Sequence, residues 1–337
     1  MRSSELERVE RLAAIFGAAG ASEAAPGAAV LVGIGDDAAV LAPCPEPLVW
    51  TVDAAVEGTH FRREWLSFED IGYRSTMAAA SDLAAMAAAP LGVLSGLVLP
   101  DDVGDAEMAA IARGQQEAVT ALGAAVVGGN LARGRELSIT TTVLGRAPSP
   151  LLRRGARPGD ALWLVGPVGL AAAGLRLLME GRPIDDEAAA ACLRAWRRPR
   201  ARIAAGLALR GVAVAAIDVS DGLARDVGHL ARASHTAAII DVRSLENAAF
   251  PDDAPALPEG ALRAAAERLG VDAARLALFG GEDYALAVAA ADGALIEGGV
   301  KIGAFEESPT ARGGVIALWA DGSREVLPEG GFDHFAR

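Results

Sequence analysis

The amino-acid sequence predicts an α/β protein of the α+β type with two domains. Its 337 residues are 52% hydrophobic and 22% charged, which is enough apolar material for two buried cores. Short apolar runs of strand character alternate with amphipathic helical segments along the chain. The prolines of Ala147-Pro148-Ser149-Pro150 interrupt regular structure. We therefore expect one domain at residues 1–147 and the other at residues 148–337.

Periodicity and turn residues predict the elements of the first domain. An amphipathic helix is expected over residues 5–16. Ser67 is expected to cap a helix that has an acidic first turn and continues to about Ala88. Trp50 lies in an expected strand and is assigned to the core. A further helix is expected over residues 105–122, and strands over residues 47–53, 92–99, 124–127 and 136–145.

The second domain is expected to continue the alternation of strand and helix. A strand over residues 161–165 leads into a Gly-Pro-Val-Gly turn at 166–169, which opens a long helix. A strand over residues 214–217 ends at the acidic run Asp218-Val219-Ser220-Asp221-Gly222, where another helix begins. Phe279-Gly280-Gly281-Glu282-Asp283-Tyr284 then enters a further strand.

Charge and cysteine content exclude several classes of protein. The net charge of −13 argues against nucleic acid and anionic membranes as partners, because both bind basic patches. The most membrane-like run, residues 75–99, is interrupted by Asp82 and Pro90. Two cysteines make no disulfide framework, and no apolar stretch of a signal peptide follows the N-terminus. We therefore expect a cytoplasmic protein.

Lysine is almost absent from the chain, and this limits how it can bind ATP. Lys301 is the only lysine, so neither a P-loop nor the strand lysine of protein kinases is present. If the protein binds ATP, the phosphates must be neutralised by magnesium, arginines and backbone amides.

Acidic residues recur beside glycines at expected strand ends and helix starts. Asp36 and Asp37 follow a glycine pair, and an isolated pair of this kind is more typical of an acidic turn between two strands. Recurrence along the chain favours a site for hard cations such as Mg²⁺, because oxygen ligands suit them and they relieve carboxylate repulsion. We expect the clusters to meet in one pocket, and the acids in question are Asp36, Asp37, Asp53, Asp82, Asp218, Asp221, Glu282 and Asp283.

The order of these motifs resembles the thiamine-monophosphate kinase family, which shares a superfamily with aminoimidazole ribonucleotide synthase and selenophosphate synthetase. The resemblance covers residues 32–335 and is specific when its blocks are taken together. It rests on GIGDDAAVL, TVDAAVEGTHF, SDLAAM, VGGN with a following RG, RRGARPGD, AIDVSDGLARDVGH, FGGEDYAL and a terminal GFDHF.

This resemblance implies an enzyme that makes thiamine diphosphate and ADP from thiamine monophosphate and ATP, with several Mg²⁺ ions. It also implies a two-domain aminoimidazole ribonucleotide synthase-like fold. The sheet of the N-terminal domain would pair with its twin in a homodimer and bind metal and ATP, and the C-terminal domain would complete the nucleotide and substrate site. The implied metal positions are Asp37, Thr51, Val52, Asp53, Asp82, Asn130, Asp218 and Asp221; the ATP positions are Gly129, Asn130, Arg153 and Ser220; the substrate positions are His60, Glu282 and Phe332.

Two positions depart from the family pattern. Asn130 stands where the family usually has an acid, and Val52 offers only its backbone carbonyl where a side-chain oxygen is common. One metal is therefore expected to bind more weakly or to be lost. Two alternatives stay open at this point: another ATP-dependent enzyme of the superfamily, such as aminoimidazole ribonucleotide synthase, and a nucleotide-binding dimer without activity. In the reaction that the resemblance implies, the acceptor is a phosphate monoester that is already a dianion at neutral pH, so no nucleophile or general base is expected.

Overall fold

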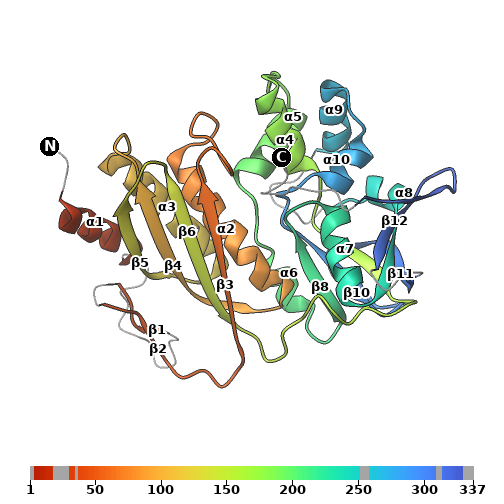
Figure 1. Ribbon diagram of the computed structural model, residues 1–337, viewed down its shortest axis with the longest axis horizontal. Helices are drawn as coiled ribbons and strands as arrows, with labels where there is room; N and C mark the ends of the chain where they lie inside the picture. Colours follow the sequence, from red (N-terminus) through yellow and green to blue (C-terminus); the bar gives the residue numbers. More distant parts are fainter. Residues whose placement is uncertain (1–3, 18–29, 35–36, 251–257, 309–312, 329–337) are drawn as a thin grey trace. The chain divides into compact units, whose positions relative to one another are not determined.

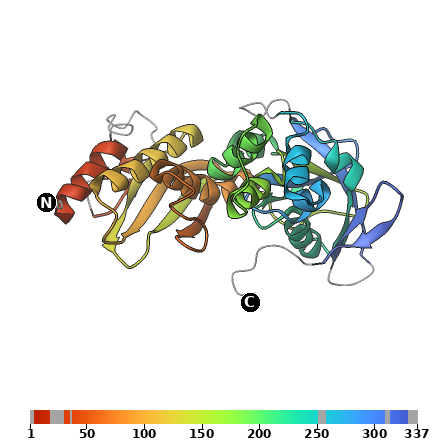
Figure 2. The ribbon, with the colours of Figure 1, turned by 90° about the horizontal axis from the view of Figure 1, so that it is seen from above.

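The computed structural model describes residues 4–17, 30–34, 37–250, 258–308 and 313–328, and Figures 1 and 2 show its helices and strands. These residues form two compact units. The first comprises residues 1–83 and 88–148, and the second comprises residues 84–87 and 149–337. Both units combine helices with a sheet, which confirms the predicted fold class. Each helix in the described part of the chain is too short or too polar to span a bilayer.

A four-stranded sheet organises the first unit. Within the described residues its order is β3-β6-β4-β5, in which β4 and β5 run parallel and the other neighbours antiparallel. A separate antiparallel pair, β1 and β2, precedes it. The strands are β1 (Val30–Val32), β2 (Val40–Leu41), β3 (Leu48–Val56), β4 (Ala89–Leu99), β5 (Val126–Arg133) and β6 (Ser138–Arg146).

Two helices, α2 (Phe68–Ala85) and α3 (Asp105–Leu122), cover one face of this sheet (Figures 1 and 2). Ser67 caps α2 as predicted, since the backbone N–H of Asp70 donates to Ser67 Oγ over 3.1 Å. The helices cross at two glycines: a Cβ on Gly114 would lie 1.9 Å from the Glu69 carbonyl oxygen, and one on Gly72 would lie 2.0 Å from that of Ile111. Only glycine permits this approach, which lets α2 and α3 pack directly on each other.

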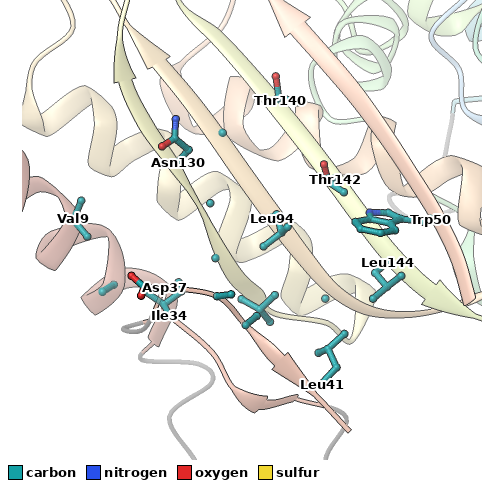
Figure 3. Close-up of a pocket in the computed structure, with 18 of the residues that line it drawn as sticks. Val9, Ile34, Asp37, Leu41, Trp50, Leu94, Asn130, Thr140, Thr142 and Leu144 are labelled. Atoms are coloured by element: carbon teal, nitrogen blue, oxygen red, sulfur yellow. The ribbon is translucent and has the colours of Figure 1, made fainter. Parts of the chain in front are cut away.

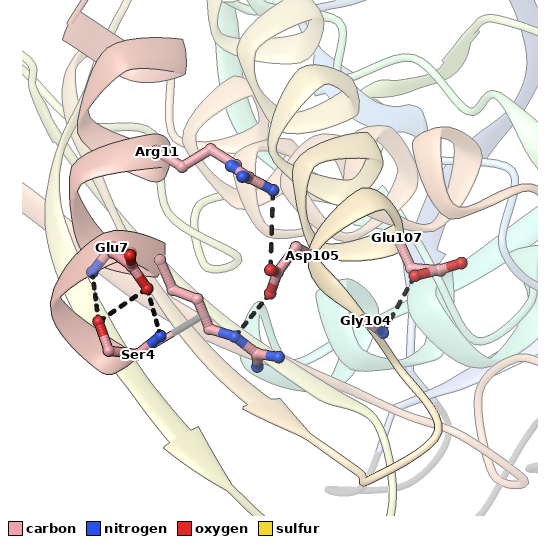
Figure 4. A network of polar contacts seen from close by, with 7 residues as sticks. Ser4, Glu7, Arg11, Gly104, Asp105 and Glu107 are labelled. Atoms are coloured by element: carbon pink, nitrogen blue, oxygen red, sulfur yellow. Dashed lines mark hydrogen bonds and ion pairs between the residues drawn. The ribbon is translucent and has the colours of Figure 1, made fainter. Parts of the chain in front are cut away.

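The N-terminal helix α1 (Glu5–Gly17) is attached to α3 by charge and by packing (Figure 4). Ser4 and Glu7 form a capping box, in which the Glu7 N–H donates to Ser4 Oγ over 3.3 Å and the Ser4 N–H donates to Glu7 Oε2 over 2.6 Å. Arg8 Nε lies 2.7 Å from Asp105 Oδ1 at the first turn of α3. Phe16 is buried, but Leu6 is 68% exposed, so part of the apolar face predicted for α1 remains open.

A mixed seven-stranded sheet organises the second unit. Within the described residues its order is β13-β12-β9-β11-β7-β10-β8, where only β12 and β9 run parallel. Its core is closed by α7, α8 and α10, while α4, α5 and α9 form a second cluster. The strands are β7 (Ala161–Val165), β8 (Ala213–Val219), β9 (Thr236–Asp241), β10 (Ala285–Ala290), β11 (Gly299–Glu307), β12 (Gly314–Leu318) and β13 (Arg324–Val326). The helices are α4 (Leu170–Met179), α5 (Glu187–Arg197), α6 (Ile203–Ala208), α7 (Leu223–Ala233), α8 (Val242–Glu246), α9 (Ala261–Leu269) and α10 (Ala273–Phe279).

Three sequence-based expectations are wrong in detail. Trp50 is 70% exposed and does not belong to the core. Asp53 lies inside β3, because that strand continues to Val56. The Gly128–Asn130 run does not end β5 but lies within it, since pairing with β4 extends the strand to Arg133. Pairing with a neighbouring strand extends β3 and β5, and Trp50 is exposed because it lies on the face of the sheet opposite to the one that α2 covers.

Candidate functional site

Three of the predicted metal positions come together between β3 and α2. Thr51 and Asp53 are two residues apart in β3, so their side chains extend from the same face of the strand. Thr51 Oγ1 donates a hydrogen bond of 2.5 Å to Asp82 Oδ2 on α2. This contact identifies the face as the one that α2 covers, and it brings a hydroxyl and two carboxylates into one group.

Asp53 is in an unfavourable setting for a carboxylate. Although solvent still reaches the residue, the surrounding protein displaces part of its water, and this burial raises its pKa above the usual value. The charge of Asp82 raises the pKa further, whereas the Ala54 N–H, 2.8 Å from Asp53 Oδ1, and the charge of His60 lower it. The His60 ring is anchored, since the Val56 N–H donates to its Nδ1 over 3.1 Å. A cation beside Asp53 and Asp82 would relieve their repulsion.

Two buried hydroxyls near this acidic group support a polar ligand there. Thr141 faces Asp53 across the β3–β6 pairing, and Ser81 precedes Asp82 on α2. Their Oγ atoms are buried, and within the described residues neither has a hydrogen-bond partner. The same residues contain no cluster of three His, Cys, Asp or Glu side chains that would hold a metal ion unaided. A magnesium ion here would thus need water or phosphate oxygens as further ligands, which is its ordinary coordination.

The other predicted positions of the first unit lie on the open face of the sheet. Asn130 and Asp37 line a hollow of about 1050 Å³ together with Trp50, Leu94 and Thr142 (Figure 3). Val52, which is 63% exposed, shares the face of Trp50 because the two residues are two positions apart in β3. The structure therefore does not group these three positions with Thr51, Asp53 and Asp82.

Gly129 lies in β5 next to Asn130, at a close approach of two strands. A Cβ at this position would lie 1.9 Å from the Ser95 carbonyl oxygen of β4, so only glycine fits. Two other predicted residues, Asp36 and Phe332, lie outside the described residues.

In the second unit, three of the predicted metal and nucleotide residues lie at the end of β8. Asp218 is inside this strand, which continues to Val219 and does not end at Ile217 as predicted. Asp218 is 6% exposed, and Ser220 and Asp221 form the turn before α7. Asp226 Oδ2 accepts hydrogen bonds of 3.0 Å from the backbone N–H groups of both Ser220 and Asp221. Burial, and then the charges of Asp218 and Asp221, raise the pKa of Asp226 to about 7. Through these two hydrogen bonds, the Asp226 carboxylate stabilises the turn before α7.

Glu282 lies directly against this turn, in a strained backbone conformation. Its φ of +67° and that of Tyr284, +52°, are in the left-handed region that non-glycine residues rarely adopt. The Glu282 N–H donates to the Ser220 carbonyl over 2.7 Å, and the Tyr284 N–H donates to that of Val219 over 2.8 Å. Trp196 Nε1 donates to Glu282 Oε2 over 2.7 Å. Backbone strain of this kind is typical of functional segments.

Asp283, in contrast, has a structural role. Its carboxylate accepts hydrogen bonds from the N–H groups of Gly169 (2.7 Å) and Ala171 (3.1 Å) at the start of α4. Burial raises its pKa to about 7, and the two backbone donors oppose that shift. Asp283 therefore fixes the segment that carries Glu282.

Arg153 precedes β7 on an exposed loop that is tied to the end of α7. Its carbonyl oxygen accepts a hydrogen bond from Ser234 Oγ over 3.3 Å. Burial, and then the charges of Arg232, Arg153 and Arg225, lower the pKa of His229 on α7. Arg153, Arg225 and Arg232 are thus close enough to this ring to act on its pKa, and guanidinium groups are suited to bind anions.

Sequence reasoning missed two residues of this region, Asp226 and Trp196. Asp226 was detectable, because an acid a few residues after Ser-Asp-Gly at a helix start is a pattern of helix N-terminal capping. The contact of Trp196 joins residues 86 positions apart in the chain, and no local pattern predicts it.

Comparison with known proteins places the chain among characterised relatives. Residues 35–147 match the family "AIR synthase related protein, N-terminal domain", and residues 157–296 match the corresponding C-terminal domain family. Thiamine-monophosphate kinase of Escherichia coli K12 is 35% identical over 320 residues, which cover 91% of this chain and 93% of that protein.

Solved structures agree with the sequence relatives. The crystal structure of thiamine-monophosphate kinase from Stenotrophomonas maltophilia K279a is similar with a TM-score of 0.77 at 32% identity, covering 96% of this chain and 98% of that one. AaThiL in complex with AMPPCP and TMP is similar with a TM-score of 0.76 at 27% identity, covering 99% of each chain.

The raised pKa of Asp226 predicts a pH-dependent stability that Asp226→Asn removes. The unfolded chain loses this proton near pH 3.8 and the folded protein near pH 7, so stability falls as the pH rises between these values. Asparagine stays neutral and can accept the same two backbone bonds. Relative to wild type, the free energy of unfolding of Asp226→Asn should increase by up to about 1.4 kcal/mol per pH unit.

Urea denaturation at pH 5, 6, 7 and 8 without divalent ions measures this difference. The control is Asp292→Asn, which replaces an exposed carboxylate paired with Lys301. Its free energy of unfolding should change with pH in parallel with that of wild type. If the free energy of unfolding of Asp226→Asn also changed with pH in parallel with that of wild type, the raised pKa of Asp226 would be contradicted.

Proposed function

This chain belongs to the thiamine-monophosphate kinase family, and we propose that it transfers the γ-phosphoryl group of ATP to thiamine monophosphate by a direct, magnesium-assisted, in-line step. The products are thiamine diphosphate and ADP. The observation that carries the proposal is the pair of acidic groups, one in each unit, that the fold holds in place: Thr51, Asp53 and Asp82 in the first, and Asp218 and Asp221 in the second.

The chemistry requires charge neutralisation more than acid–base catalysis. A phosphate monoester has a second pKa near 6, so thiamine monophosphate is already a nucleophilic dianion at neutral pH. Two unit charges 4 Å apart repel by about 4 kcal/mol at an effective dielectric of 20, and both reactants carry several charges. Magnesium, when bound, supplies the positive charge that lets the two anions approach. Asp53 and Asp82 in the first unit are proposed magnesium ligands, and so, separately, is Asp218 in the second unit.

The remaining residues would bind and orient the reactants. Ser220, Gly129 and Arg153 are proposed to contact the nucleotide, and the last offers a guanidinium suited to phosphate oxygens. His60, anchored by the Val56 N–H, is proposed to contact the acceptor phosphate. Glu282 would face the cationic ring of thiamine, and Phe332 would contact the same substrate. We further propose a cytoplasmic location and no nucleic-acid or membrane partner, in keeping with the charge of −13.

Incubation of purified protein with γ-labelled ATP, Mg²⁺ and thiamine monophosphate tests the function. Chromatography should show the label in thiamine diphosphate and none on the protein. Acid-stable or hydroxylamine-labile labelled protein would contradict direct transfer. ATP binding by calorimetry without any product would favour a non-catalytic nucleotide-binding protein instead.

Removal of one carboxylate charge from either acidic group should abolish turnover. We expect Asp53→Asn and Asp218→Asn each to lower kcat by at least about a hundredfold, because each would remove a charged magnesium ligand. Steady-state assays at saturating Mg²⁺ measure this loss, with melting curves to confirm folding. The controls are Asp101→Asn and Asp292→Asn, exposed carboxylates in ion pairs with Arg133 and Lys301, which should keep normal rates. A near-normal rate for Asp53→Asn would exclude it as a metal ligand.

Restoration of an acid at position 130 should tighten metal binding. Asn130→Asp adds a charged oxygen ligand on the open face, so the Mg²⁺ concentration for half-maximal rate should fall several-fold. A magnesium titration of the initial rate measures it. Asn247→Asp, which makes the same change at the end of α8, is the matched control. An unchanged or higher Mg²⁺ requirement would show that position 130 is not a ligand here.

We propose that the open face of the β3-β6-β4-β5 sheet pairs with that of a second copy in a homodimer. Exposed apolar side chains gather there, with Leu48 56%, Trp50 70% and Val52 63% exposed, and such patches are typical of protein interfaces. Trp50→Glu should therefore shift the protein toward monomer in sedimentation velocity, because it would bury a charge in the interface. Val326→Glu, at an exposed residue of β13, is the control. A dimer of unchanged stability in Trp50→Glu would place the interface elsewhere.

A further inference from the structure

Trp196 joins the helical part of the second unit to the segment that carries Glu282. It lies near the C-terminal end of α5, is 1% exposed, and donates from Nε1 to Glu282 Oε2 over 2.7 Å. The indole N–H is a neutral donor. It therefore restrains a carboxylate oxygen without itself cancelling the negative charge.

Backbone contacts alone do not determine where this carboxylate lies. Hydrogen bonds to Ser220 and Val219 fix the backbone on both sides of Glu282, and its φ of +67° sets the direction in which the side chain leaves. The carboxylate is three rotatable bonds further out, and such a side chain keeps considerable rotamer freedom. The bond from Trp196 supplies a restraint at the end of the side chain.

The indole is itself held firmly. Cys192, one helical turn before Trp196, is fully buried, and a Cβ on Gly174 of α4 would lie 2.3 Å from the Cys192 carbonyl oxygen. This glycine lets α5 pack directly on α4. The start of α4 is in turn bound by Asp283, the neighbour of Glu282. Trp196 and Glu282 thus belong to one connected and well-packed assembly of elements.

We infer that Trp196 is a positioning residue that sets the Glu282 carboxylate against the cationic ring of the phosphoryl acceptor. The inference rests on the proposed function, in which Glu282 contacts that ring. It assigns Trp196 to acceptor binding and not to the nucleotide or to the transfer step. Loss of the Trp196 indole N–H should therefore raise the KM for the phosphoryl acceptor and leave the KM for ATP unchanged. Loss of a tryptophan that only stabilises the fold would not produce this selective change.

The test is Trp196→Phe, which removes the N–H donor and keeps an aromatic ring. Hydrogen bonds to charged groups are among the stronger ones in proteins, so the KM for thiamine monophosphate should rise about tenfold. The KM for ATP and the kcat at saturating substrates should stay within about twofold of wild type. Equal effects on both KM values, or an unchanged KM for thiamine monophosphate, would overturn the inference.

The chain offers a matched control in Trp319, whose Nε1 donates to Glu325 Oε2 over 3.0 Å in the same unit. Trp319→Phe removes an equivalent Trp–Glu bond and should leave both KM values unchanged. A double-mutant cycle then isolates the pair. Once Glu282→Gln is present, the addition of Trp196→Phe should change the KM for thiamine monophosphate by less than about twofold, and a further tenfold rise would contradict the coupling.

A spectroscopic measurement keeps the inference testable if Trp196→Phe fails to fold. In protein labelled with ¹⁵N at its five indoles, Glu282→Gln should shift one indole N–H resonance, and thiamine monophosphate should move that same resonance in wild type. If Glu282→Gln and thiamine monophosphate shifted different indole resonances, the inference would be overturned. A folded wild-type protein without turnover would overturn the proposed function and this inference together, whereas active wild type with an unaffected variant overturns the inference alone.

Discussion

Carboxylates kept close to other carboxylates are the constraint on which the acidic group of each unit depends. The charge of Asp82 raises the pKa of Asp53, and the charges of Asp218 and Asp221 raise that of Asp226. The fold does not relieve this repulsion by separating the groups. It holds them with specific donors instead, such as the Thr51 hydroxyl and the backbone N–H groups of Ser220 and Asp221. Such an arrangement suits a protein whose ligands bring positive charge.

The two faces of the four-stranded sheet have different roles because side chains alternate along a strand. Thr51 and Asp53 face α2 and meet Asp82, whereas Trp50 and Val52 extend from the opposite, open face. Asn130 lines the hollow on that open face. Both departures from the family pattern, at positions 52 and 130, therefore lie on one face, and the acidic group on the covered face is left complete. The positions that depart from the family pattern are therefore separated in space from Thr51, Asp53 and Asp82.

In the second unit, one short segment joins several parts of the chain. The backbone of Glu282 and Tyr284 is bound to the end of β8, the Asp283 carboxylate is bound to the start of α4, and the Glu282 carboxylate is bound to α5. Glycines make these approaches possible: a Cβ on Gly281 would lie 2.7 Å from the Ser220 carbonyl oxygen. Because several elements restrain it at once, the segment keeps left-handed backbone angles that would otherwise relax.

The sequence by itself determined the fold class, the helix over residues 105–122, the cap at Ser67, and the motifs that carry the family resemblance, because these depend on neighbouring residues and short periods. Tertiary structure alone decided that Trp50 is exposed, that Asp53 lies within a strand, and that positions 52 and 130 share a face. It also decided that Asp226 supports the turn at Ser220 and that Trp196 reaches Glu282. The physical reason is that strand pairing and long-range hydrogen bonds join residues far apart in the chain, and local patterns contain no information about which distant partner is chosen.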